Sequence, residues 1–207
     1  MQKTTQNRNQ SMTGNTARNA DRGQNMSHPA TSSTTARVTM RSVALRICIT
    51  AMFAAIVVAL SSFGVPVPGG HLYLCDIAIC MAAILLDPIS AFFACGVGSF
   101  LGDLFFYPAP MFVSLVTHGL QGIVISLIAH HVLKKHPVLS SGIAVTVGAV
   151  IMVTGYTLGK IFVYSTFEYA MIKLPYEILQ AAVGAVAGML LTWKCGVHKL
   201  YDRLMRA

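Results

Sequence analysis

The chain has 207 residues, of which 55% are hydrophobic and only 11% are charged. Soluble domains typically carry about a quarter charged residues, so this composition excludes an ordinary soluble domain. The net charge of +8 does not indicate nucleic-acid binding, because most basic residues precede the first apolar run or follow the last one and no basic patch has interleaved aromatic residues.

The first 40 residues are rich in Asn, Gln, Ser, Thr and Arg and contain almost nothing to bury. Such a segment cannot offset the entropy lost on ordering, so we expect residues 1–40 to be a disordered cytoplasmic tail. No apolar segment follows its basic residues until about Ile47, which argues against a secretory signal. Residues 41–207 are then one membrane domain with a short basic C-terminal tail.

Six apolar runs of about membrane length follow the tail, since a hydrocarbon core of ~30 Å needs about 20 helical residues. They lie at about 44–64, 71–86, 89–107, 111–133, 138–164 and 174–194. The second run is short, and the Asp87-Pro88 pair separates it from the third because proline disfavours a helical residue before it. A single re-entrant hairpin over 71–107 is the alternative reading.

Basic residues in the connecting segments predict the orientation. The N-terminal tail, the 134–136 segment and the C-terminal tail are basic, whereas the opposite connections at 65–70, 108–110 and 165–173 contain only Lys173. Six crossings place the basic segments on one side. The sequence therefore predicts an all-α, multi-pass protein of the bacterial inner membrane with both termini in the cytoplasm.

Ionisable side chains inside a bilayer are costly and indicate a functional site. Here they gather in the outer halves of four predicted helices, as polar pairs three or four residues apart and thus on one helical face. The pairs are Asp103 with Tyr107, His118 with Gln121, Tyr156 with Lys160, and Glu177 with Gln180. This distribution predicts a small-molecule pocket that opens outward and is closed below.

Each of these residues also has a purely structural interpretation. Lys160 can extend its ammonium group to the outer interface, and His118 can make an ordinary helix–helix contact. Asp76 can stabilise the start of its helix, and Asp103 can form a structural ion pair with Lys160. The clustering of the pairs at one depth favours the pocket over these separate explanations.

Ala51, Ala55 and Ala59 recur every four residues in the first predicted helix. Small residues at this spacing allow two helix backbones to approach closely, so the face packs either on this chain's own helices or on a partner. The glycines at 96–102 are interpreted as close-packing positions and not as a phosphate loop, because no strand precedes them.

Together these motifs resemble the substrate-binding S components of energy-coupling factor (ECF) vitamin transporters. The resemblance covers about residues 44–195 and rests on the order of several loose motifs. These are the alanines Ala51 and Ala55, the segments 64–70 (GVPVPGG), 71–76 (HLYLCD), 86–88 (LDP), 96–103 (GVGSFLGD), 117–122 (THGLQG) and 174–180 (LPYEILQ).

The resemblance implies a six-helix fold whose substrate site lies near the outer face, lined by helices four to six and the first outer loop. It implies docking through Ala51, Ala55 and Ala59 onto a membrane coupling protein driven by two ATPases. No catalytic residue, metal ligand or cofactor is expected. The sequence itself contains no G-x-x-x-x-G-K-[ST] motif, so ATP must be hydrolysed by a partner.

Departures from the family narrow the substrate. Nickel and cobalt relatives begin with Met-His, whereas this chain begins Met1-Gln2, and the only tryptophan, Trp193, lies at the inner end, away from a thiamine-type stacking position. Lys160 with His118 suits a carboxylate, and the acids and amides of the predicted pocket suit hydroxyls or amides. Pantothenate is favoured, with a hydroxymethylpyrimidine or a B6 vitamer next.

Two other classes of protein stay open at this point. A self-sufficient secondary permease usually shows paired repeats and broken helices at the midplane, and neither is found. An intramembrane hydrolase using Ser99 and His118 is less favoured, because no G-x-S-x-G motif is present.

Overall fold

The computed structural model describes residues 30–206 except 69 and 134, and side chains within 41–205. The chain divides into two compact units, residues 1–42 and residues 43–207. The first unit contributes the start of helix α2 (Ala30–Ser61), which begins ahead of the predicted end of the tail. Residues 1–29 lie outside the described residues, so disorder there stays a prediction.

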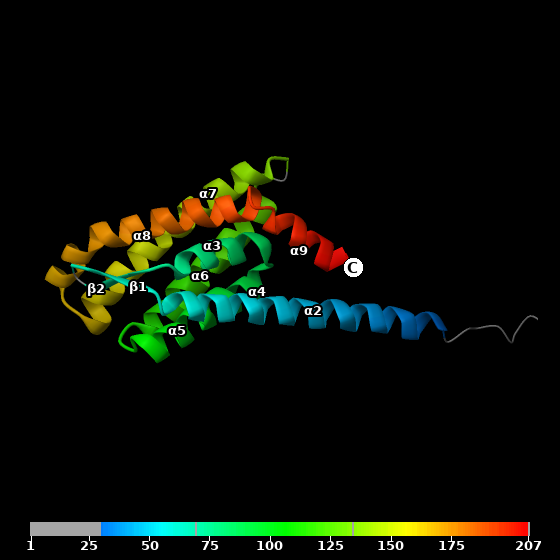
Figure 1. Ribbon diagram of the computed structural model, residues 1–207, viewed down its shortest axis with the longest axis horizontal. Coiled ribbons are helices and arrows are strands. Elements are labelled where there is room, and N and C mark those ends of the chain that lie inside the picture. Colours follow the sequence, from blue (N-terminus) through cyan, green and yellow to red (C-terminus); the bar gives the residue numbers. More distant parts are fainter. Residues whose placement is uncertain (1–29, 69, 134, 207) are drawn as a thin grey trace, which may run out of the picture. The chain divides into compact units, whose positions relative to one another are not determined.

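The second unit is helical apart from one hairpin (Figure 1). After α2 come β1 (Gly64–Val67), β2 (Gly70–Tyr73), α3 (Cys75–Leu85), α4 (Pro88–Phe92), the π-helix η1 (Phe93–Val97), α5 (Gly98–Phe106), α6 (Met111–His131), α7 (Pro137–Gly159), the π-helix η2 (Lys160–Tyr164), α8 (Phe167–Trp193) and α9 (Val197–Arg206). The strands are antiparallel, with Gly64 opposite Tyr73 and Val67 opposite Gly70.

Five helical segments in the described part of the chain are long and apolar enough to cross a membrane. They are Arg41–Ser61, Pro88–Phe106, Met111–His131, Pro137–Tyr164 and Phe167–Trp193. These correspond to five of the six predicted runs. The run predicted at 71–86 is different, because its first residues form β2 and its helix α3 has only 11 residues, or about 16 Å at ~1.5 Å per residue.

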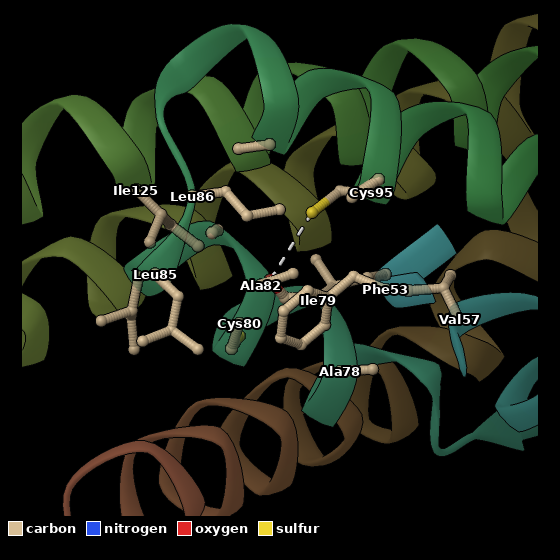
Figure 2. Packing of buried hydrophobic residues seen from close by; sticks show 14 of the residues in the cluster. Phe53, Val57, Ala78, Ile79, Cys80, Ala82, Leu85, Leu86, Cys95 and Ile125 are labelled. Atoms are coloured by element: carbon tan, nitrogen blue, oxygen red, sulfur yellow. Dashed lines mark hydrogen bonds between the residues drawn. The ribbon is translucent and has the colours of Figure 1, made fainter. Parts of the chain in front are cut away.

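Helix α3 lies in the centre of the hydrophobic core. All of its residues except Ile77 and Met81 are buried, as expected for a helix that is apolar on every side. Figure 2 shows Ile79 beside Cys95, whose thiol lies 3.6 Å from the Ile79 carbonyl oxygen, with Phe53 of α2 nearby. The core therefore surrounds α3 on several sides.

Helix α2 has one buried and one exposed face within residues 43–61. Ile49, Phe53 and Val57 are buried at a spacing of four residues. The predicted alanine face, Ala51, Ala55 and Ala59, is exposed. The structure therefore favours the interpretation in which these alanines face a partner, because they do not pack against the described helices of this chain.

Glycines bring neighbouring helices close together. A Cβ added to Gly98 would lie 3.1 Å from the Ala54 carbonyl oxygen of α2, and one added to Gly102 would lie 2.6 Å from the Ser61 hydroxyl. These contacts confirm that the glycines at 96–102 are close-packing positions. Likewise, a Cβ on Gly184 of α8 would lie 2.5 Å from the Asp76 Cβ of α3.

We expect Gly184→Ala to lower the melting temperature, because the added methyl group would force α3 and α8 apart, at a cost of about 1–3 kcal/mol. Gly142→Ala is the matched control, since a Cβ there would meet only Met189 at 3.7 Å, an ordinary contact. That control should be neutral or stabilising, because alanine loses less backbone entropy than glycine in a helix. Equal melting temperatures for the two variants would contradict the close approach.

The Asp87-Pro88 pair forms the predicted break between α3 and α4. The Asp87 carboxylate accepts hydrogen bonds from the Ser90 backbone (3.3 Å) and hydroxyl (2.9 Å) and lies 3.7 Å from the Arg46 guanidinium. Partial burial acts to raise the pKa of Asp87, but these hydrogen bonds and the Arg46 charge outweigh burial and lower it. The turn is therefore held by an ionised aspartate.

The last spanning helix begins earlier than predicted. Residues 165–173 were expected to be an outer connection, but α8 starts at Phe167, and the Thr166 hydroxyl accepts a hydrogen bond from the Tyr169 N–H at its N-terminus. Pro175 resembles a helix start in the sequence, because proline is common in the first turn. In the structure Pro175 lies inside α8, so Lys173 becomes a helical residue.

Candidate substrate pocket

A pocket of about 210 Å³ lies where the β1–β2 hairpin meets the first half of α8. Its walls come from β2, α5, α6, α7, η2 and α8, with Ser61 at the end of α2 and Cys75 at the start of α3. Most of the lining side chains are polar or aromatic, unlike the apolar core around α3. The polar groups are organised in three hydrogen-bonded clusters.

The first cluster is a buried ion pair. Lys160, the first residue of η2, donates to Glu177 of α8, and the exposed fractions of these residues are 1% and 2%. The Thr157 hydroxyl lies 3.5 Å from the same carboxylate, and the Lys160 ammonium is 5.4 Å from the centre of the Tyr156 ring. Lys160 therefore neither reaches the outer interface nor pairs with Asp103.

The second cluster joins three helices through hydroxyl groups. The Ser114 hydroxyl of α6 donates to the Asp103 carboxylate of α5. Because the Ser114 proton points to Asp103, the Tyr156 hydroxyl of α7 must donate to the Ser114 oxygen. These two hydrogen bonds hold Asp103 at the pocket wall and fix the Tyr156 ring 5.3 Å from the His118 ring.

The third cluster lies at the base of the pocket and links α3, α6 and α8. The Gln180 amide donates to Asp76, and its oxygen accepts from the Tyr73 backbone N–H at 2.9 Å. His118 Nδ1 donates to the Gln121 oxygen at 2.7 Å and lies 4.0 Å from Asp76 Oδ1. Among the described residues Asp76 Oδ1 has no hydrogen-bond partner.

Both π-helical segments adjoin residues of the pocket. Segment η1 leads directly into α5, which carries Ser99 and Asp103, and η2 begins at Lys160. The Ser165 N–H bonds to the Lys160 carbonyl oxygen at 2.9 Å, which closes the wide turn. Single π-turns inside α-helices are frequent at functional sites.

Seven of the eight side chains predicted for the site line this pocket. They are Asp103, Tyr107, His118, Tyr156, Lys160, Glu177 and Gln180. The eighth, Gln121, lies behind His118 as its hydrogen-bond partner. Whether these residues bind substrate stays a prediction, but the structure brings them together.

The sequence interpretation missed several lining residues. Tyr169 and Lys173 lie on the same face of α8 as Glu177, at spacings of four residues, and were missed because α8 was expected to begin at 174. Ser99 also lines the pocket, and its buried hydroxyl has no hydrogen-bond partner among the described residues. An unpartnered buried hydroxyl facing a pocket is available to a bound molecule.

Tyr73 and Tyr164 were also missed. Tyr73 lies in the hairpin, where burial raises the pKa of its phenol to about 12, with the charge of Asp103 adding to the effect. Its hydroxyl therefore stays protonated at physiological pH. The sequence would indicate that Tyr73 lies at the pocket only if residues 64–73 were recognised as a hairpin.

The fold and the pocket define a multi-pass membrane protein with a polar binding pocket at one end of a helical bundle. The family model for the S component of ECF-type riboflavin transporters matches residues 42–196, and the chain belongs to this family. A protein of Pyrococcus woesei named "Uncharacterized protein in gap 3'region" is 29% identical over 126 residues, which is 60% of this chain and 82% of the relative.

Membership of this family makes the chain a substrate-binding transporter subunit and not an enzyme. The hydrolase alternative is thereby excluded.

Proposed function

We propose that this chain captures a small water-soluble vitamin or vitamin precursor at the outer face of the bacterial inner membrane, for import by an ATP-driven ECF transporter. The observation that carries the proposal is the pocket of about 210 Å³ with its three polar clusters. Next to the third polar cluster, the residues packed around α3 form a hydrophobic core.

The distribution of basic residues supports an outward-facing pocket. Lys135, Lys194 and Lys199 lie at or beside helix ends that are remote in sequence from the pocket residues, and these lysines and Arg46 of α2 have exposed side chains. Basic segments favour the cytoplasmic side. The hairpin and the pocket then lie at the outer face, with both termini in the cytoplasm.

Partners are required, because the chain has no ATP-binding motif of its own. We propose a membrane coupling protein with two ATPase subunits. The exposed alanines Ala51, Ala55 and Ala59 support docking through α2, since small exposed residues at a spacing of four permit close approach of another helix.

The size of the pocket bears on the substrate. Drug-sized molecules typically occupy pockets of roughly 300–1,000 Å³, so about 210 Å³ favours pantothenate, a hydroxymethylpyrimidine or a B6 vitamer over a larger molecule. Riboflavin is the second candidate, because the matching family is described as the S component of riboflavin transporters. Its planar ring would find aromatic partners among five lining tyrosines, Tyr73, Tyr107, Tyr156, Tyr164 and Tyr169.

We expect the purified chain to bind one of these vitamins and, reconstituted alone in vesicles, not to accumulate it against a gradient. The measurements are calorimetry with pantothenate, pyridoxal, hydroxymethylpyrimidine and riboflavin, and uptake of the radiolabelled binder. Vesicles that also contain the coupling protein and the ATPases, with ATP inside, are the positive control. Concentrative uptake by the chain alone would establish the secondary permease instead.

A further inference from the structure

The pocket contains two lysines whose electrostatic situations differ. Lys160 is buried and neutralised by its ion pair with Glu177. Lys173 lies on α8, one turn before Glu177, and also lines the pocket. Its side chain is only partly buried and has no salt bridge or hydrogen bond among the described residues. Lys173 is therefore the lysine that remains free to pair with a bound anion.

The Lys173 ammonium has a hydroxyl group beside it. A Cβ added to Gly70 would lie 3.1 Å from the Tyr169 hydroxyl and 3.4 Å from the Lys173 Nζ, so both groups converge under the hairpin. Gly70 has a φ of 127°, which side-chain-bearing residues rarely adopt. The absent side chain leaves the space over these two donors free.

The remaining wall of the pocket has the opposite character. Asp103 lines the same pocket as Lys173, yet no ion pair between the two is found among the described side chains. The unpartnered Ser99 hydroxyl lies four residues before Asp103 on α5. A bound molecule therefore meets hydroxyl and carboxylate acceptors on α5 and cationic and phenolic donors on α8.

We propose that the substrate carries a carboxylate, which binds the Lys173 ammonium and the Tyr169 hydroxyl beneath Gly70, while its neutral polar groups reach Asp103 and Ser99. This inference rests on the proposed function and deepens it. A charge-assisted hydrogen bond to a carboxylate is roughly twice as strong as a neutral one. Among the candidate vitamins it selects pantothenate, which is an acid, over riboflavin, pyridoxal and hydroxymethylpyrimidine, which carry no carboxylate.

The test compares acids with neutral analogues of the same shape. Calorimetry on the full-length purified chain would use pantothenate with panthenol, nicotinate with nicotinamide, and riboflavin. We expect the tightest binder to be an acid, preferred over its neutral analogue by about tenfold or more, which corresponds to ~1.4 kcal/mol. Lys173→Met should remove this preference by weakening the acid alone.

Two further variants separate the charge of Lys173 from folding and from general electrostatics. Lys173→Arg should keep the preference, because it keeps the cation. Lys199→Met makes the same substitution at an exposed lysine of α9 and should bind the acid like the unmodified chain. Melting temperatures of all variants would verify that each is folded.

The outcomes distinguish this inference from the proposed function. Tightest binding of riboflavin, panthenol or nicotinamide, or an acid preference that survives in Lys173→Met, would overturn the carboxylate site and leave vitamin binding in place. Absence of binding by all five compounds and also by pyridoxal and hydroxymethylpyrimidine would overturn both.

Discussion

Replacing Lys160 by methionine should both destabilise the protein and abolish substrate binding. The Glu177 carboxylate, with an exposed fraction of 2%, would lose its cation and keep only the 3.5 Å contact with Thr157. Leaving one member of a buried ion pair unpaired typically costs about 3–5 kcal/mol.

The double variant Lys160→Met, Glu177→Gln tests the cause. It removes both charges, so stability measured by thermal unfolding should largely recover, because a neutral amide is far less costly to bury than a carboxylate. Pantothenate binding by calorimetry should not recover, since the pocket wall has changed. If the double variant is as unstable as Lys160→Met, the loss comes from packing and not from the unpaired charge.

Replacing Ala55 by tryptophan should prevent assembly with the coupling protein while leaving the isolated chain intact. Ala55 is exposed on α2, on the side of the helix opposite to the buried Phe53 and Val57. A large ring there meets no described neighbour in this chain but blocks close approach of a partner helix. We expect co-purification to be lost, with melting temperature and pantothenate affinity unchanged.

Val150→Trp is the matched control for this prediction. Val150 lies on α7 with an exposed fraction of 62%. The substitution therefore adds the same ring to another exposed helix surface. Co-purification should persist in this variant. Retained assembly in Ala55→Trp, or equal loss in both variants, would show that the alanine face does not dock.

The membrane-spanning segments follow from the sequence because bilayer thickness sets both their length and their composition. Four predicted runs therefore lie within about three residues of the observed spanning segments, and the fifth ends where predicted but begins at Phe167 instead of 174. The hairpin was missed for a different reason. A strand is stabilised by its partner, and the glycines and prolines of 64–70 are equally compatible with an irregular loop.

Side-chain pairing could not be predicted in the same way. Helical spacing placed Lys160 and Glu177 on pocket-facing sides of their helices. It did not identify the ion-pair partner of Lys160, for which Asp103 was the residue named. The choice depends on how α5, α7 and α8 approach one another. In the structure Lys160 pairs with Glu177, and Asp103 accepts a hydrogen bond from Ser114.

The amino-acid sequence by itself determined the class of protein, the five long spans and the residue types of the pocket, because these depend on local hydropathy and on spacing along single helices. Only the tertiary structure decided that Ala55 is exposed, that Lys160 is neutralised and that Lys173 and Tyr169 enter the pocket. Each of these depends on contacts between segments distant in sequence, such as α3 with α8 and the hairpin with α8, which no periodicity within one helix encodes.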